Sequence, residues 1–134
     1  MAWLARYQPQ LLSILRIVTG LLFLEHGMQK MLHFPPMPAA MAAGIPAKMM
    51  PIILAAGIIE LVGGALVTVG LLTRLAAFIC AGEMAVAYWM VHFTRGGFFP
   101  ANNGGDAAIL YCFVFLFIAA AGPGPWALRR SAKI

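Results

Sequence analysis

Four long apolar segments divide this chain of 134 residues and limit what it can fold into. They cover residues 11–32, 49–72, 74–93 and 106–121, and each approaches the roughly 20 residues that a helix needs to cross a bilayer. Hydrophobic residues make up 63% of the chain, against about 45–50% in a soluble domain, and so short a chain has too little interior to bury them. We therefore expect an integral membrane protein, all-α, with residues 1–134 forming one four-helix transmembrane bundle.

The connections between these segments predict the order of the helices in space. Prolines between Phe34 and Pro46 end the first helix, because proline has no amide proton to donate. Only Gly70–Thr73 separates the second and third helices, which predicts a tight antiparallel hairpin. The third connection, residues 94–105, is aromatic and glycine-rich, and we expect it to fold back over the mouth of the bundle. No repeat period is evident, although both helix pairs share a helix-loop-helix pattern.

The basic residues predict topology. The net charge is +5, but these residues are scattered between apolar runs and form no patch with interleaved aromatics, which argues against a nucleic-acid partner. With both termini in the cytoplasm, the positive-inside rule places five basic residues inside and only Lys30, Lys48 and Arg95 outside. The five are Arg6, Arg74, Arg129, Arg130 and Lys133. Arg16 lies in the inner part of the first helix, and we interpret Arg16 and Arg74 as structural residues.

The four acidic residues fall in or at the edge of four different apolar segments. They are Glu25, Glu60, Glu83 and Asp106. A carboxylate in lipid costs about 2.5–3.5 kcal/mol on insertion scales, so it normally turns inward and finds a partner. We expect the four helices to bring these carboxylates to one polar pocket in the outer half of the bundle.

Two segments on the first and second helices carry most of the expected pocket. Spacings of three and four place Glu25, His26, Gln29 and Lys30 on adjoining faces of one helix. This cluster is either a neutralised charge group that orients the helices or a site that handles protons or binds a ligand, since histidine titrates near neutral pH. Glu60 lies among small residues in 56–65, a pattern that indicates close helix packing with an interhelical ion pair or, alternatively, a ligand site.

The outer ends of the third and fourth helices supply the remaining candidates. Glu83 and His92 are nine residues apart and therefore point to opposite sides of a regular helix. His92 is either an interfacial residue or a contact to another helix. Asn103 and Asp106 stand where a side chain would cap the fourth helix, and they also belong to the candidate pocket.

No cofactor is specified by these residues alone. Cys80 and Cys112 have neither C-x-x-C nor zinc spacing, so we expect buried thiols and no metal site. A haem between His26 and His92 is a weak alternative, because nothing else in the chain indicates haem. Five aromatic residues, Tyr88, Trp89, Phe93, Phe98 and Phe99, form either an interfacial belt, the commoner case, or a stack for a flat ligand such as a quinone.

Ordered motifs across nearly the whole chain resemble the DoxX family. They are Leu15-Arg16, Gly20-Leu21-Leu22-Phe23-Leu24, His26-Gly27, Gln29-Lys30, Glu60-Leu61, Gly63-Gly64, Gly70-Leu71, Thr73-Arg74, Phe98-Phe99, Asn102-Asn103-Gly104-Gly105-Asp106 and Gly122-Pro123-Gly124-Pro125-Trp126. The resemblance implies a four-helix bundle in the bacterial inner membrane. It also implies a link to quinone-dependent or sulfur-dependent redox, through a namesake that is a thiosulfate:quinone oxidoreductase subunit.

By motif, the recurrent polar positions of that family fall on His26, Gln29, Lys30, Glu60, Arg74, Asn103 and Asp106. Two departures are visible: Asp106 stands where glutamate is usual, and the usual Ser-Leu-Asp ending reads Ala127-Leu128-Arg129. The family supplies no agreed catalytic set.

Three functions fit the sequence. The first is an accessory redox component that binds a quinone while a partner subunit supplies electrons, since the chain has neither a nucleotide fingerprint nor a dithiol. The second is a small proton-coupled transporter, which would need to form a homo-oligomer. The third is an assembly or scaffold protein without catalysis.

Overall fold

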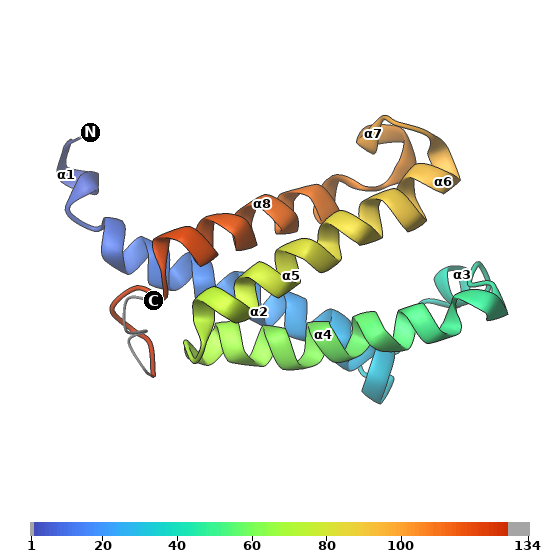
Figure 1. Cartoon of the computed structure of the whole chain (residues 1–134), viewed down its shortest axis with the longest axis horizontal. Coiled ribbons are helices and arrows are strands. Elements are labelled where there is room, and N and C mark those ends of the chain that lie inside the picture. The colour runs from blue at the N-terminus through green and yellow to red at the C-terminus, as the bar shows by residue number, and fades with distance from the viewer. Residues whose placement is uncertain (1, 129–134) are drawn as a thin grey trace.

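The computed structural model describes residues 2–128, and helices dominate this part of the chain, which contains no strand. The basic residues Arg129, Arg130 and Lys133, used above to predict topology, lie outside the described residues. Figure 1 shows two long helical hairpins lying against each other.

The first hairpin consists of α2 (Gln8–Leu32) and α4 (Met50–Val69), which pack along most of their length. The short helix α1 (Ala2–Ala5) precedes it, and α3 (Ala39–Ala42) and the 3₁₀ turn η1 (Ala47–Met49) lie in its connection.

The second hairpin consists of α5 (Thr73–Ala87) and α8 (Asp106–Ala121). A π-helical segment, η2 (Tyr88–His92), and α6 (Phe93–Gly96) continue α5, and α7 (Pro100–Asn103) lies in the connection to α8. Both hairpins begin and end at the same end of the molecule, which we call the terminal end; the opposite end is the loop end (Figure 1).

Three of the four expected helices differ from the prediction in the structure. The first helix begins at Gln8, because Pro9 in a first turn needs no amide partner. The second ends at Val69, where Gly70 adopts a left-handed φ of 79°. The third is not a regular helix throughout, because the π-helical segment η2 interrupts it. The fourth spans the expected residues.

The described residues contain three helices that are long and apolar enough to cross a membrane: Gln8–Leu32, Ala47–Val69 and Thr73–Gly96. The fourth, α8, has 16 residues, or roughly 24 Å at 1.5 Å per residue, against a hydrocarbon thickness of about 30 Å. The structure therefore supports a helical membrane protein with three helices of spanning length and a shorter fourth one.

The loop that was expected to cover the bundle mouth covers only one hairpin. Figure 1 shows α6 and α7 at the loop end of α5 and α8, away from α3 at the end of the first hairpin. Phe98 and Pro100 of this loop line a pocket formed with α5 and α8. The connection is therefore a cover for the second hairpin alone.

Glycines bring α2 and α4 close together, as the small residues around Glu60 predicted. A Cβ atom added to Gly64 would lie 2.6 Å from the backbone nitrogen of Leu24, and one added to Gly27 would lie 2.7 Å from the Cα of Leu61. Real Cβ atoms do not approach other atoms so closely. Only glycine at these positions allows the observed separation of the helices.

An aromatic and aliphatic core joins the two hairpins. The rings of Phe23 on α2 and Phe115 on α8 pack edge to face, with centroids 4.7 Å apart. Both side chains are fully buried, together with Val67, Cys80 and Ile118. This core sits between the hairpins on the terminal side of the polar residues described next.

Candidate functional site

An ion pair joins the two helices of the first hairpin. Nζ of Lys30 on α2 lies 2.5 Å from both carboxylate oxygens of Glu60 on α4. Glu60 is only 2% exposed, so its charge is neutralised inside the protein. The interhelical ion pair inferred for Glu60 is therefore confirmed.

Glu83 on α5 adds a second carboxyl group to this region. Its Oε2 atom is buried and has no hydrogen-bond partner among the described residues. A Cβ added to Gly63 of α4 would meet the Sγ of Cys80 on α5, and Glu60 and Glu83 each lie one turn from this contact toward the loop end, so the two acids stand at the same level of adjacent helices. We call Lys30, Glu60 and Glu83 the polar centre.

Cys80 lies on α5 one turn before Glu83 of the polar centre. Its side chain is fully buried, and its Sγ would meet a Cβ added to Gly63 of α4. The charges of Glu60 and Glu83 both act on this thiol. Both cysteines are free, with Cys80 buried and Cys112 half-buried on α8.

The remaining candidates on α2 do not enter the polar centre. Glu25 and His26 are exposed, and Gln29 is half-buried. Nδ1 of His26 lies 2.8 Å from the carbonyl oxygen of Leu22, within the same helix. The His26 ring lies edge-on to Tyr111 of α8, with centroids 6.1 Å apart, and the charge of Glu25 also acts on Tyr111. These residues therefore form a surface between α2 and α8.

Tyr111 was not among the residues predicted for the site. Its ring packs against Phe23 and His26 of α2, so it joins the α2 surface to the aromatic core. The sequence offered one signal, since Tyr111 is the single tyrosine of the last apolar segment.

His92 and Asn103 build a separate network at the loop end. The Asn103 amide nitrogen donates to the carbonyl oxygen of Gly97 at 2.7 Å, and its Oδ1 accepts from the backbone N–H of Gly105 at 2.8 Å. Nδ1 of His92 lies 3.2 Å from the carbonyl oxygen of Asn103. The hydroxyl of Tyr88 donates to the carbonyl oxygen of Phe98 at 2.5 Å. These contacts hold residues 97–105 in place, which is a structural role.

Asp106 stands apart from the other acidic residues, contrary to expectation. It is exposed, and it is the first residue of α8 rather than its cap. The cap position belongs to Gly105, with no side-chain hydrogen bond. Asp106 still places a negative charge on the first turn of the helix, where the helix dipole favours it. The four carboxylates therefore do not share one pocket.

Arg16 and Arg74, which we interpret as structural residues, both donate to backbone carbonyl groups. Arg16 is fully buried at the terminal end, and its guanidinium donates to four carbonyl groups over distances of 2.5–2.7 Å. Two of these acceptors are Val67 and Thr68 in the last turn of α4, and the others are Pro123 and Trp126. Arg74 donates to Ala119 and Ala120 in the last turn of α8.

Carbonyl oxygens, rather than carboxylates, therefore surround the buried charge of Arg16. The last-turn carbonyls of a helix carry its negative dipole end, which favours a cation there. Through the carbonyl groups of Pro123 and Trp126, Arg16 also anchors the segment after α8. Two further hydrogen bonds hold this segment: the Trp126 N–H donates to the Ser13 hydroxyl, and the Leu128 N–H donates to the carbonyl oxygen of Val69.

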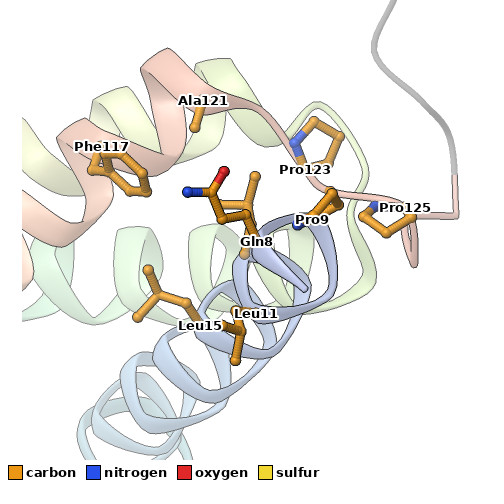
Figure 2. Close-up of a pocket in the computed structure, with 10 residues that line it drawn as sticks. Gln8, Pro9, Leu11, Leu15, Phe117, Ala121, Pro123 and Pro125 are labelled. Carbon is orange, nitrogen blue, oxygen red and sulfur yellow. The ribbon is translucent and has the colours of Figure 1, made fainter. Parts of the chain in front are cut away.

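Two hollows in the described part of the chain are lined by neither Lys30 nor Glu60. The larger, about 1000 Å³, lies at the terminal end, where the start of α2 meets the end of α8. Figure 2 shows that apolar side chains such as Leu15, Phe117 and Pro123 line it, with the Gln8 amide among them. The smaller, about 350 Å³, lies between α5 and α8, and its lining residue Met84 directly follows Glu83 on α5.

The two histidines considered for haem take part in different contacts, His26 on the α2 surface and His92 in the loop-end network. Within residues 2–128, no group of three or more histidine, cysteine or acidic side chains is arranged to hold a metal ion. The polar centre and the neighbouring Cys80 together offer a lysine, two carboxyl groups and a thiol.

Comparison with known proteins identifies the family. The DoxX family model matches residues 11–93. A protein of Haemophilus influenzae described as uncharacterised is 45% identical over 127 residues, which is 93% of this chain and 92% of that protein. No solved structure matches the chain significantly. With its apolar helices of spanning length, this chain belongs to the DoxX family of membrane proteins.

Proposed function

We propose that this protein is an accessory component of a quinone-linked or sulfur-linked redox reaction in the bacterial inner membrane, and that its polar centre moves protons. One observation carries the proposal. The Oε2 atom of Glu83 is buried and has no hydrogen-bond partner within residues 2–128, at the level of the partly buried Lys30–Glu60 ion pair.

An unpartnered carboxyl oxygen in a membrane interior is costly to keep. A buried polar group without a hydrogen bond costs on the order of 1–3 kcal/mol in proteins, and ionisable residues inside membrane helices usually serve a function. A carboxyl group such as Glu83 can bind and release a proton there, and Lys30 and Glu60 provide a neighbouring charged pair. This is a suitable arrangement for a proton relay.

The chemistry of a quinone requires such a relay. Reduction of a quinone to a quinol takes up two electrons and two protons. Cys80 and Cys112 are free thiols on different helices and do not form a redox-active dithiol. In this proposal the electrons therefore come from a partner subunit that oxidises a reduced sulfur compound. Glu83 passes the protons to the quinone and regains them from the aqueous side.

The exposed residues of α2 supply a place for that partner. Glu25 and His26 are polar and exposed on a helix of spanning length. Lipid is a poor neighbour for both side chains. In this proposal a partner subunit, or a second copy of this chain, covers them. In this proposal both termini face the cytoplasm, because that orientation places five basic residues of the sequence inside and Lys30, Lys48 and Arg95 outside.

A scaffold without catalysis is the second candidate, because the Lys30–Glu60 pair satisfies itself and joins α2 to α4. The test is purification in mild detergent, followed by an absorption spectrum and mass spectrometry of the extracted lipophilic molecules. A quinone near one per chain is the expected result. A Soret band would show haem instead, and the absence of any carrier would favour the scaffold.

Glu83→Gln separates the two candidates further, with Asp106→Asn at the exposed acid as the matched control. In a redox component, Glu83→Gln keeps the amount of folded protein and the bound quinone, and only proton movement is lost. In a scaffold, the substitution changes only the amount of folded protein.

A further inference from the structure

The two hairpins use the same structural device. In the first, Arg16 near the start of α2 donates to two carbonyl groups in the last turn of α4. In the second, Arg74 near the start of α5 donates to two carbonyl groups in the last turn of α8. Each hairpin is thus closed at the terminal end by an arginine of its first helix that holds the end of its second helix.

The sequence repeats in the same register. Positions 16 and 74 hold arginine and positions 25 and 83 hold glutamate, so a shift of 58 relates α2 to α5. The second helices end at Gly70 and Gly122, which a shift of 52 relates, and both glycines have positive φ, 79° and 97°. An added Cβ at either glycine would lie 3.1 Å from the guanidinium of the arginine in the same hairpin. The chain therefore contains two copies of one helix-loop-helix unit that run in the same direction.

These shifts relate the ion pair of the first hairpin to the smaller pocket of the second. Lys30 corresponds to Tyr88 and Glu60 corresponds to Cys112, and both of these residues line the pocket of about 350 Å³. We call the contact face between the two helices of a hairpin its seam. Four further residues of the first seam, which meet across it in two pairs, also correspond to residues that line this pocket. They are Gly27, Met31, Gly57 and Leu61, which correspond to Ala85, Trp89, Ile109 and Phe113.

Glycine explains why one seam is closed and the other is open. Gly27 lies against the backbone of Leu61, and a Cβ added to Gly57 would lie 3.0 Å from the sulfur of Met31. At the corresponding positions Ala85 and Ile109 carry side chains, which prevent an equally close approach of α5 and α8. A pocket remains in the second hairpin where the first hairpin has its ion pair.

The pocket has the chemistry of a site for an uncharged ring. Four of the nine residues that line it are aromatic, and among these described residues none is charged. The aromatic residues are Tyr88, Trp89, Phe98 and Phe113. Its volume of about 350 Å³ falls in the range of about 300–1,000 Å³ that is typical of small-molecule sites. Aromatic rings favour stacked or edge-on contacts with a flat ligand.

The loop-end network holds the outer wall of this pocket. Phe98 and Pro100 line it, and the carbonyl oxygen of Phe98 accepts a hydrogen bond from the hydroxyl of Tyr88. Asn103 fixes the same loop through Gly97 and Gly105. The network that includes His92 and Asn103 therefore shapes a cover over the second hairpin.

We propose that this pocket binds an uncharged, planar ring with an apolar tail, which is the chemistry of a quinone. This inference rests on the proposed function and adds the location of the carrier. Met84 lines the pocket and directly follows Glu83, so a ring bound there lies at the same level along α5 as Glu83 of the polar centre.

Trp89 provides a direct test, since quinones quench tryptophan fluorescence. In a Trp3→Phe/Trp126→Phe background, Trp89 is the remaining tryptophan of the chain. Trp126 makes its hydrogen bonds through backbone groups, which phenylalanine retains. A decyl-tailed benzoquinone with a fully substituted ring serves as the probe, because it leaves no ring position for thiol addition. We expect saturable quenching of Trp89 by this quinone.

Two substitutions fill the pocket from opposite helices: Ala85→Leu on α5 and Cys112→Phe on α8. Each is expected to weaken quinone binding at least tenfold while the protein melts at or above the parent temperature. Ala107→Leu, at an exposed position of α8, adds the same bulk outside the pocket and should leave binding within twofold of the parent.

A second measurement covers the case in which a filled variant does not fold. In a Cys80→Ala background Cys112 is the remaining thiol, and saturating quinone should slow its labelling by a maleimide at least fivefold. An unchanged labelling rate would overturn the inference. Equal competition by a decyl-chain phospholipid would show an acyl-chain groove and would also overturn it.

The results separate this inference from the proposed function. If quinone binds but neither filled variant weakens it, the location is wrong and the proposed function stands. If the parent protein shows no saturable binding, the pocket assignment and the quinone-linked function are both wrong.

Discussion

Lys30 of α2 binds both carboxylate oxygens of Glu60 of α4, each at 2.5 Å from Nζ. The pair lies where glycines allow the two helices to approach, with Gly27 against the backbone of Leu61. Close backbone contact and a buried ion pair therefore fix the register of the first hairpin together.

Removing the lysine should leave a buried, unpaired carboxylate. Lys30→Met is expected to lower the free energy of unfolding by on the order of 3–5 kcal/mol, because breaking a buried pair leaves one charge uncompensated. The double variant Lys30→Met/Glu60→Met should recover most of that loss, because no charge remains. Unfolding in mixed detergent micelles measures both. A double variant no more stable than the single one would contradict this view of the pair.

The close glycine contacts between α2 and α4 lead to a second prediction. Gly27→Ala should destabilise the protein by about 1–3 kcal/mol, because the added methyl group overpacks the contact with Leu61. Gly82→Ala is the matched control in α5, where no atom lies within 4 Å of an added Cβ. It should raise stability slightly through helix propensity. Equal effects of the two substitutions, measured by thermal unfolding, would be evidence against the seam.

Arg16 should not tolerate lysine. Its planar guanidinium reaches four carbonyl groups at once, and a lysine ammonium group cannot reproduce that geometry. Arg16→Lys is expected to cost on the order of 3 kcal/mol and to increase hydrogen exchange in residues 122–128. Arg95→Lys, at an exposed position, serves as the control. Unchanged exchange near Trp126 in Arg16→Lys would show that Arg16 does not anchor this segment.

The side-chain hydrogen bonds of Asn103 should hold residues 97–105 in place. Asn103→Ala removes the hydrogen bonds to Gly97 and Gly105 and should lower the protection of residues 97–105 in hydrogen-exchange mass spectrometry. Asn102→Ala changes an exposed neighbour and should leave the protection unchanged. The same loop supplies Phe98 to the pocket, so Asn103→Ala should also weaken the binding of the benzoquinone probe. Full protection in Asn103→Ala would mean that other contacts hold the loop.

The helices were largely predictable, because apolar length and punctuation residues define them. The bounds of α8 match the expectation, since glycine flanks it at both ends, Gly105 and Gly122. The π-helical segment at Tyr88–His92 could not be foreseen, because its residues are as apolar and aromatic as those of an ordinary helix. Tertiary contacts, including the hydroxyl of Tyr88 on the loop, accompany that local change.

The candidate site was predictable only where two helices carried complementary groups. The opposite charges of Lys30 and Glu60, together with the small residues around Glu60, indicated an interhelical pair. Spacing along one helix could not show which neighbour each face meets, so the position of His26 beside Tyr111 required the structure. Asp106 was misplaced because a helix start can present its first residue outward while the preceding glycine caps it.

The sequence alone did not reveal the repeat of the helix-loop-helix unit. Only a few positions retain the same residue in both copies, among them the arginine, the glutamate and the final glycine. The two connections differ in length, so a single shift does not align both helices of each pair. The shared capping contacts of Arg16 and Arg74 show the correspondence directly.

The central claim is that Glu83 exchanges a proton during redox turnover. Infrared difference spectroscopy of the protein in lipid, recorded as bound quinone is reduced electrochemically, tests it most directly through the C=O stretch of a protonated carboxyl group. We expect this band to change in the parent protein and in Asp106→Asn, and to be silent in Glu83→Gln. An identical difference band in Glu83→Gln, or none in the parent protein with quinone bound, would contradict the account.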